Sequence, residues 1–159
     1  ACRSGSRWAM TAVEQLSRLL ADRSLVDAVL GDHPSNDPSL PPAETFLVHG
    51  CGLLAETLAL LGGGVSVALH YNGEILHAAL RHRGGYLDAD GWSDEATLRR
   101  RWAEIVECEP DEIEIGAYDA AAAAWFRAAD PELDARVERF ADELVRRDAR
   151  LIAALRAAD

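Results

Sequence analysis

The feature that most constrains the fold is an apolar segment that ends in three consecutive glycines. Residues 53–61, LLAETLALL, are hydrophobic around nearly the whole of a helical wheel, and Gly62-Gly63-Gly64 follows. A helix that is apolar on all sides has to be buried on all sides, and glycine commonly ends helices. We therefore expect a central helix, surrounded by the rest of the chain. Gly50-Cys51-Gly52 precedes the run, so the first turn of this helix carries a cysteine.

Strands are predicted after this helix. Residues 65–71, 74–80 and 86–89 are short apolar stretches bounded by turn residues, and Asn72-Gly73 between the first two is a strong signal for a two-residue hairpin. A brief further strand is expected over residues 112–115. These strands predict one antiparallel sheet beside the central helix.

Helical patterns flank the sheet on both sides in the sequence. Apolar residues recur at helical spacing over residues 11–30, a proline-rich loop covers 31–42, and an alanine-rich helix is expected around 119–129. Residues 91–93 are interpreted as a turn into a further helix, with Ser93 as its N-cap. A long C-terminal helix from Pro131 has apolar positions at Leu133, Val137, Phe140, Leu144, Leu151 and Leu155. Their spacing favours packing on the chain's own core over a coiled-coil partner, so an oligomer through this helix is not favoured. The predicted class is α+β.

Length and composition predict one domain. The 159 residues are enough for a single buried core. We interpret residues 1–9, which precede Met10, as a candidate vector-derived tail, and residues 10–159 as a single domain with a long C-terminal helix.

Charge narrows the expected partners. The net charge of −11 argues against nucleic acid and anionic membranes, which select basic surfaces, and is compatible with a peptide or protein substrate of basic character. No segment resembles a signal peptide or a transmembrane helix, so a cytoplasmic protein, or an effector delivered to another cell, is expected. The three cysteines, Cys2, Cys51 and Cys108, form no CxxC motif and favour a reducing compartment.

The residues from Cys51 to Asp88 offer a thiol, an imidazole and a carboxylate in an order suited to catalysis. A thiol nucleophile needs a base to take its proton and a carboxylate to orient that base. Cys51 lies at a helix N-terminus, where the backbone dipole stabilises a thiolate. His77 and Asp88 lie on successive predicted strands. In Cys108, by contrast, neighbouring carboxylates are expected to raise the pKa of the thiol.

The second hairpin decides which acid reaches the histidine. Facing residues of paired strands share parity, so His77 and Asp88 lie on one face only where paired residue numbers sum to an odd value. A four-residue loop over 81–84 places Asp88 directly opposite His77. A two-residue turn at Gly84-Gly85 brings Asp90 nearer instead, and a three-residue loop puts both acids on the wrong face. The sequence leaves these registers open.

GCGLLAETLALLGG followed by HAALRHRGGYLDADGW resembles the papain-like, transglutaminase-like superfamily of cysteine enzymes. The resemblance implies a papain-like core helix on a small antiparallel sheet, with Cys51 as nucleophile, His77 as general base and acid, and Asp88 as the orienting carboxylate. It implies a thiol hydrolase (a peptidase, amidase or deamidase) that acts on peptide or carboxamide bonds without a cofactor. The papain pattern also has a glutamine shortly before the cysteine, whereas the only glutamine here is Gln15. His49 or a backbone N–H is therefore expected to complete the oxyanion site.

Two alternatives remain at this stage. One is a protein-binding or regulatory module that has this fold but no catalytic turnover. The other is a zinc site built from His49, Cys51, His70 and His77, although His-Gly-Cys is a poor spacing for two ligands. No metal or other cofactor is expected.

Overall fold

The computed structural model describes residues 11–157. Within this range the strands are β1 (Val65–Tyr71), β2 (Glu74–His82), β3 (Gly85–Asp88), β4 (Gly91–Ser93) and β5 (Glu114–Ala117). The α-helices are α1 (Ala12–Leu20), α2 (Arg23–Leu30), α3 (Pro42–Val48), α4 (Cys51–Leu60), α5 (Glu95–Val106), α6 (Ala120–Ala129), α7 (Leu133–Arg147) and α8 (Ala149–Arg156). The strands form one antiparallel sheet in the order β4-β3-β2-β1-β5. The predicted α+β class is confirmed. The interpretation of residues 1–9 as a tail, with Cys2, lies outside the described residues.

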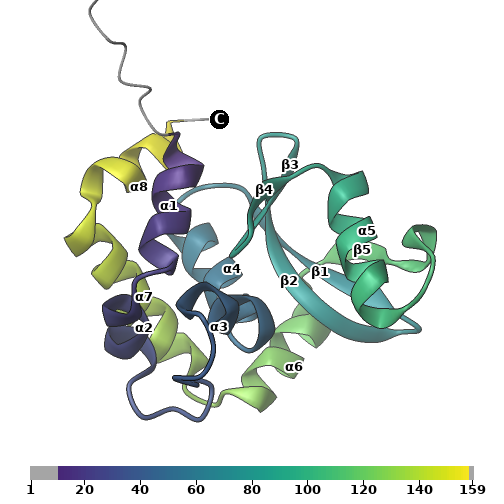
Figure 1. The fold of residues 1–159 in the computed structure, drawn as a ribbon, viewed down its shortest axis with the longest axis horizontal. Helices are drawn as coiled ribbons and strands as arrows, with labels where there is room; N and C mark the ends of the chain where they lie inside the picture. Colours follow the sequence, from purple (N-terminus) through teal and green to yellow (C-terminus); the bar gives the residue numbers. More distant parts are fainter. Residues whose placement is uncertain (1–10, 158–159) are drawn as a thin grey trace, which may run out of the picture.

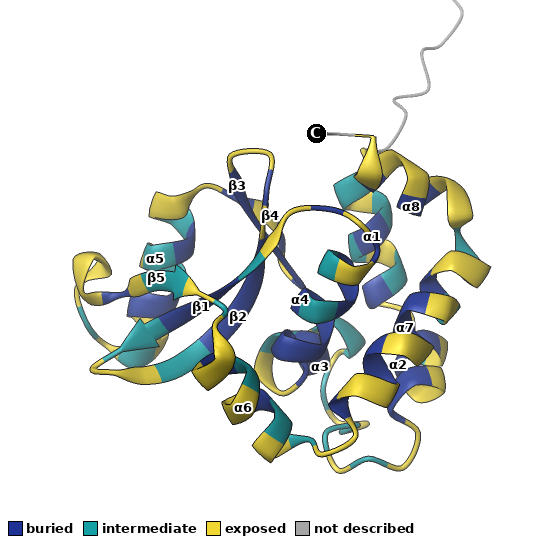
Figure 2. Cartoon of the chain, turned by 180° about the vertical axis from the view of Figure 1, so that it is seen from behind, coloured by how far each residue is buried: buried dark blue, intermediate teal, exposed yellow. Residues whose placement is uncertain are grey.

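Helix α4 is the centre of the fold. It packs against β2 with one side and against α7 with the other (Figure 1). Seven of its ten residues are buried, and it runs through the middle of the molecule in Figure 2. The opposite face of the sheet is covered by α5, where Leu98 and Trp102 meet Leu69 and Ile113 in a second, smaller core. The sheet is thus enclosed between two helices, and the prediction of a central apolar helix is confirmed.

Two predicted helices are each broken by an aspartate that caps a new helix. The N-terminal pattern divides at Asp22, whose side chain accepts the backbone N–H of Ser24 at 2.9 Å. The predicted long C-terminal helix ends at Arg147, and Asp148 caps α8 by accepting the N–H of Leu151 at 2.9 Å. An N-cap carboxylate competes with helix continuation because it satisfies the free N–H groups of a first turn. Both single-helix predictions were wrong at these points.

The apolar side chains of the C-terminal segment all pack into the core of the same chain. Leu133, Val137, Phe140, Leu144, Leu151 and Leu155 are buried in the core around α4. The predicted packing on the chain's own core is confirmed. No helix of residues 11–157 is long and apolar enough to cross a bilayer.

The segment before the cysteine and the segment after the third strand also differ from expectation. Residues 45–49, for which no helix was predicted, form most of α3 and its C-cap. Residues 91–93, predicted as a turn, form the edge strand β4, and Asp94 in place of Ser93 caps α5 through the N–H of Thr97. The indole N–H of Trp92 donates to the carbonyl of His82 at 3.1 Å, which fixes this edge strand across the hairpin.

The first hairpin has the predicted turn, whereas the second follows a register that was not predicted. Tyr71 pairs with Glu74, so the two-residue Asn72-Gly73 turn is confirmed. In the second hairpin His82 pairs with Gly85, which leaves Arg83 and Gly84 as the turn. The paired numbers sum to an odd value, as the parity condition requires, but neither the loop over 81–84 nor the Gly84-Gly85 turn is present. Asp88 therefore lies on the same face as His77, at a diagonal position.

Candidate active site

Cys51 is the first residue of α4 and lies at a tight junction with α3. The N–H groups of both His49 and Gly50 donate to the carbonyl of Thr45, at 3.2 and 2.8 Å, which ends α3 and redirects the chain. A Cβ on Gly50 would lie 3.2 Å from that same carbonyl oxygen, so the turn favours glycine. The side chain of Cys51 is 5% exposed, and it forms part of a cavity wall.

The N-terminus of α4 has no side-chain cap among the described residues. The first backbone bond of the helix is donated by Leu54 to Gly50 at 2.9 Å. The preceding N–H groups, those of Cys51, Gly52 and Leu53, are the ones an α-helix leaves without intrahelical partners. An uncapped helix start next to a thiol stabilises negative charge on sulfur or on an oxygen bound there.

His77 and Asp88 form a buried pair. Nε2 of His77 lies 2.9 Å from Oδ2 of Asp88, and the two side chains are 0% and 3% exposed. The other ring nitrogen, Nδ1, is buried and has no hydrogen-bond partner within residues 11–157. One nitrogen is therefore held by a carboxylate while the other remains available to exchange a proton.

The electrostatics of His77 link it to Cys51 as well as to Asp88. Burial by itself lowers the pKa of His77, but the hydrogen bond to Asp88 and the nearby Cys51 thiol outweigh burial and raise the pKa to about 9. Asp88 and Cys51 both act to raise the pKa of the imidazole. Near neutral pH the ring is thus held as an imidazolium between a carboxylate and a sulfur.

Asp88 is held from three directions. Oδ2 accepts from His77 and from the guanidinium of Arg101 on α5, while Oδ1 accepts the backbone N–H of Asp90 at 2.9 Å. Burial raises the pKa of Asp88, but the bond to His77 and the positive charges of His77 and Arg101 lower it overall. Asp90 is half-exposed and pairs with Arg101 at 3.3 Å. The structure therefore places Asp88, and not Asp90, against the imidazole.

Two side chains of α5 complete the setting of the imidazole, and neither role was predicted. Trp102 is buried with its ring stacked on His77, the ring centroids 4.3 Å apart. Arg101 belongs to a run of three arginines, residues 99–101, a pattern typical of a solvated helix surface. Only the packing of α5 on the sheet shows that Arg101 is the one that reaches Asp88.

A β-bulge lies directly before His77. Leu69 of β1 pairs with His77 and the next residue, His70, pairs with Ile75, so Leu76 is the extra residue on β2. Bulges redirect side chains locally and often lie beside functional sites. Leu76 contributes to the wall of the cavity that also contains Cys51.

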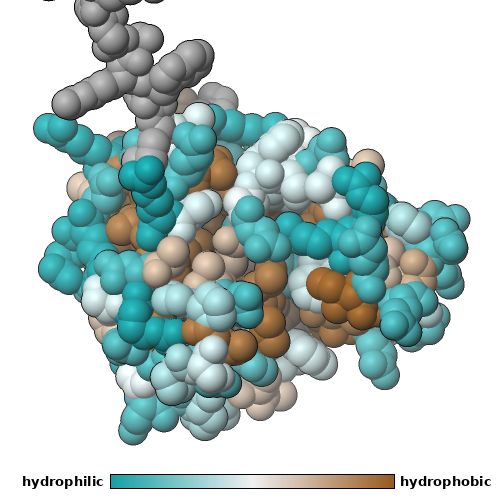
Figure 3. All heavy atoms as spheres, viewed as in Figure 1, coloured by the Kyte–Doolittle hydropathy of each residue, from teal (hydrophilic) through white to brown (hydrophobic). Residues whose placement is uncertain are grey.

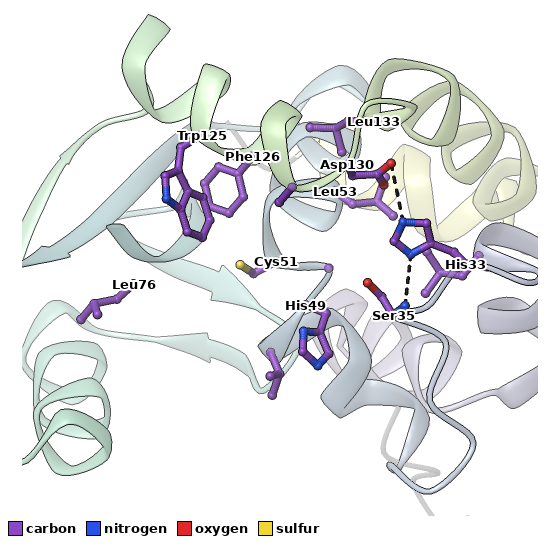
Figure 4. A pocket seen from close by; sticks show the side chains of 14 residues that line it. His33, Ser35, His49, Cys51, Leu53, Leu76, Trp125, Phe126, Asp130 and Leu133 are labelled. Atoms are coloured by element: carbon purple, nitrogen blue, oxygen red, sulfur yellow. Dashed lines mark hydrogen bonds and ion pairs between the residues drawn. The ribbon is translucent and has the colours of Figure 1, made fainter. Parts of the chain in front are cut away.

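That cavity has a volume of about 250 Å³ and is bounded by α3, α4, α6 and the loop after α2. Figure 4 shows the Cys51 sulfur directed into it, with Trp125 and Phe126 on one side and His49 on the other. His49, the predicted alternative oxyanion donor, lines the cavity, but no hydrogen bond assigns it that role. In the space-filling view apolar side chains gather on this face, with a hollow between them (Figure 3).

The residues of the zinc alternative do not form a metal site. Within residues 11–157 no three His, Cys, Asp or Glu side chains come together as a set that could hold a metal ion. Cys108 lies elsewhere, after α5, and its thiol pKa is raised by partial burial and then by Glu112, Glu109 and Asp111. Glu109 is one of the two neighbours from which the sequence predicted this direction.

Comparison with known proteins gives no relative. No family model, no curated protein and no solved structure matches the chain. The site therefore has to be interpreted from its own geometry.

Gly52 allows α6 to pack closely against the first turn of α4, next to Cys51. A Cβ at position 52 would lie 2.5 Å from Cδ1 of Phe126 on α6. Gly52→Ala should therefore destabilise the protein by about 1–3 kcal/mol, although alanine is the better helix former. Urea unfolding measures the loss. Gly116→Ala is the control, because its Cβ would approach nothing closer than 3.8 Å; an unchanged or raised stability of Gly52→Ala would contradict the packing described.

Arg101 acts as a positioning residue for Asp88. Arg101→Ala removes a cation from Asp88, so its pKa should rise and the acidic limit of Cys51 alkylation should move to higher pH, with a loss of about 1–3 kcal/mol in unfolding free energy. The pH profile of alkylation is the measurement. Arg100→Ala, an exposed neighbour on the same helix, should leave the profile unchanged. A purely structural Arg101 would lower stability without moving the profile.

Proposed function

We propose that this protein is a cysteine-dependent hydrolase that acts on peptide or carboxamide bonds through a thioester on Cys51. One observation carries the proposal: a buried imidazole has one nitrogen on a carboxylate and its other nitrogen unpaired, with a thiol at an uncapped helix N-terminus close by. A structural histidine and a buried cysteine would not need this arrangement.

Each group has a distinct part in the proposed reaction. His77 holds the proton that Cys51 loses, and the sulfur attacks the carbonyl carbon. The negative oxygen lies at the N-terminus of α4, where backbone N–H groups stabilise it. The imidazolium then donates its proton to the leaving amine, so the C–N bond breaks and a thioester remains. Water, activated by His77, hydrolyses the thioester and regenerates the thiol. Asp88 keeps the ring in one orientation throughout.

The order of these residues in the chain supports a papain-like enzyme. A cysteine that starts the core helix, a histidine on a following strand and an acid on the next strand are features of the superfamily that the sequence resembles. We also propose a reducing, cytoplasmic setting, supported by the free thiols of Cys51 and Cys108. A peptide or protein of basic character suits the net charge of −11.

An activated ester tests the covalent step. With p-nitrophenyl acetate, Cys51 should displace p-nitrophenolate and carry the acetyl group as a thioester, seen as a burst followed by slower turnover. Peptide mass spectrometry should locate the acetyl group on Cys51. Added hydroxylamine distinguishes the acceptors, since a hydroxamate forms faster than acetate if amines are preferred to water.

Two variants serve as controls for this assay. Cys51→Ala should abolish the burst, and Cys108→Ala should leave it intact. The proposal fails if wild-type protein shows no burst, or if acetylation is distributed equally between Cys51 and Cys108.

A further inference from the structure

The cavity beside Cys51 is apolar where it meets the sulfur. Its apolar lining includes Val48, Leu53, Leu76, Trp125 and Phe126. Val48 and Trp125 are 56% and 49% exposed, although large apolar side chains are usually covered. Exposed apolar groups that border a cavity mark a surface that binds something.

The α6 wall of this cavity is fixed in place. Phe126 rests on Gly52 and stacks on Tyr118, with ring centroids 5.5 Å apart. The Tyr118 hydroxyl donates to Glu56 of α4 at 3.0 Å, and Arg127 pairs with the same carboxylate at 3.3 Å. The aromatic pair of Trp125 and Phe126 is thus attached to the helix that carries the thiol. A preformed wall binds its ligand without a large ordering cost.

The opposite end of the cavity is polar, but its charge is already compensated. Asp130 pairs with the buried Arg136 at 3.0 Å. Nδ1 of His33 accepts the N–H of Ser35 at 3.2 Å, and its Nε2 lies 3.8 Å from Asp130 (Figure 4). No arginine is among the lining residues of the described chain. An anionic substrate group therefore finds a carboxylate and no free cation.

We propose that this cavity is the acyl-side specificity pocket, and that it selects carboxamides whose acyl residue has one neutral apolar side chain, branched aliphatic or aromatic. The inference rests on the proposed function, because Cys51 is the attacking group. The volume of about 250 Å³ lies below the range of about 300–1,000 Å³ typical of drug-sized ligands, which suits a single residue.

Aldehyde analogues of single amino acids test this selectivity without knowledge of the natural substrate. The sulfur of Cys51 adds to the aldehyde carbon, the carbonyl π bond opens, and the thiol proton passes to the oxygen, giving a reversible hemithioacetal. The side chain next to that carbon then occupies the acyl-side position. Protection of Cys51 from iodoacetamide reports binding.

N-acetyl-leucinal and N-acetyl-phenylalaninal should protect Cys51 at concentrations about tenfold lower than N-acetyl-aspartal. Trp125→Ala should reduce this difference to about threefold or less by removing one wall. Ile105→Ala, which removes an exposed apolar side chain of α5 outside this cavity, should preserve it.

The two levels of the proposal fail differently. Slow alkylation of Cys51 in the absence of any aldehyde, at the rate of Cys108, overturns the proposed function and the pocket with it. Rapid alkylation combined with equal protection by the three aldehydes overturns the pocket alone. Equal loss of selectivity in Trp125→Ala and Ile105→Ala also overturns it, because the effect would then not come from the cavity wall.

Discussion

Replacing His77 with glutamine should slow alkylation of Cys51 by iodoacetamide about thirtyfold near neutral pH, since only a few per cent of an ordinary cysteine is thiolate there. The side chain of glutamine can still donate to Asp88, but it cannot take the proton of a thiol. Turnover of p-nitrophenyl acetate should fall further, by about 10²–10⁴-fold, because both acylation and deacylation use the imidazole.

Three comparisons make this result specific. Cys108 in the same molecule is an internal reference, and its rate should not change. His70→Gln removes a partly buried histidine of β1 that is not part of the His77–Asp88 pair. Thermal unfolding of His77→Gln shows whether the fold is kept, since His77 is wholly buried. A folded His77→Gln protein with the wild-type alkylation rate would end the case for a thiol–imidazole pair.

The central helix and the first hairpin could be predicted from the sequence, because hydrophobic pattern and turn chemistry act locally. The all-round apolar run gave the central helix, and Asn72-Gly73 gave the first hairpin, with both turn residues at positive φ as a tight turn of this kind requires. The order of thiol, imidazole and acid could also be predicted, since it is a property of the chain alone. The sequence does not specify the distances between the thiol, the imidazole and the acid in the folded protein.

The register of the second hairpin shows why. Local preference favours glycine at both central turn positions, which points to Gly84-Gly85. The chain instead turns at Arg83-Gly84, with Arg83 at a φ of 50°. Gly85 is instead required for the packing of β4, because a Cβ there would lie 2.3 Å from the ring of Trp92. A contact from the next strand thus decides the register, and with it that Asp88 meets His77.

Arg101 and the cavity wall also depend on contacts between elements that are distant in the sequence. Arg101 reaches Asp88 from α5, and Phe126 reaches Gly52 from α6. Each of these contacts joins elements whose mutual packing no single-sequence pattern specifies. The main structural effect of Gly52, beside Cys51, is to admit the ring of Phe126.

The raised pKa of His77 predicts a loss of stability in alkaline solution. A histidine with a pKa of 6.5 when unfolded and about 9 when folded binds its proton more tightly in the native state. Its contribution is complete below pH 6.5, declines as pH rises, and is gone above about 9. The shift corresponds to about 3 kcal/mol of unfolding free energy. The pH dependence from Asp88 runs in the opposite direction, because the pKa of Asp88 is lowered in the folded protein. The stability that Asp88 contributes is lost only as pH falls below 3.8, the ordinary pKa of an aspartate.

Urea unfolding of wild type and His77→Gln across this range measures the effect as a difference between the two proteins. The difference should decrease by about 3 kcal/mol between pH 6.5 and 9. Asp88→Asn should remove most of that decrease, since the bond to Asp88 is the main cause that raises the pKa of His77. Cys51→Ala should remove a smaller part, because the thiol is the next cause. If the difference between wild type and His77→Gln is constant over this range, the imidazole is not held as an imidazolium, and the ion pair on which the proposed chemistry depends is absent.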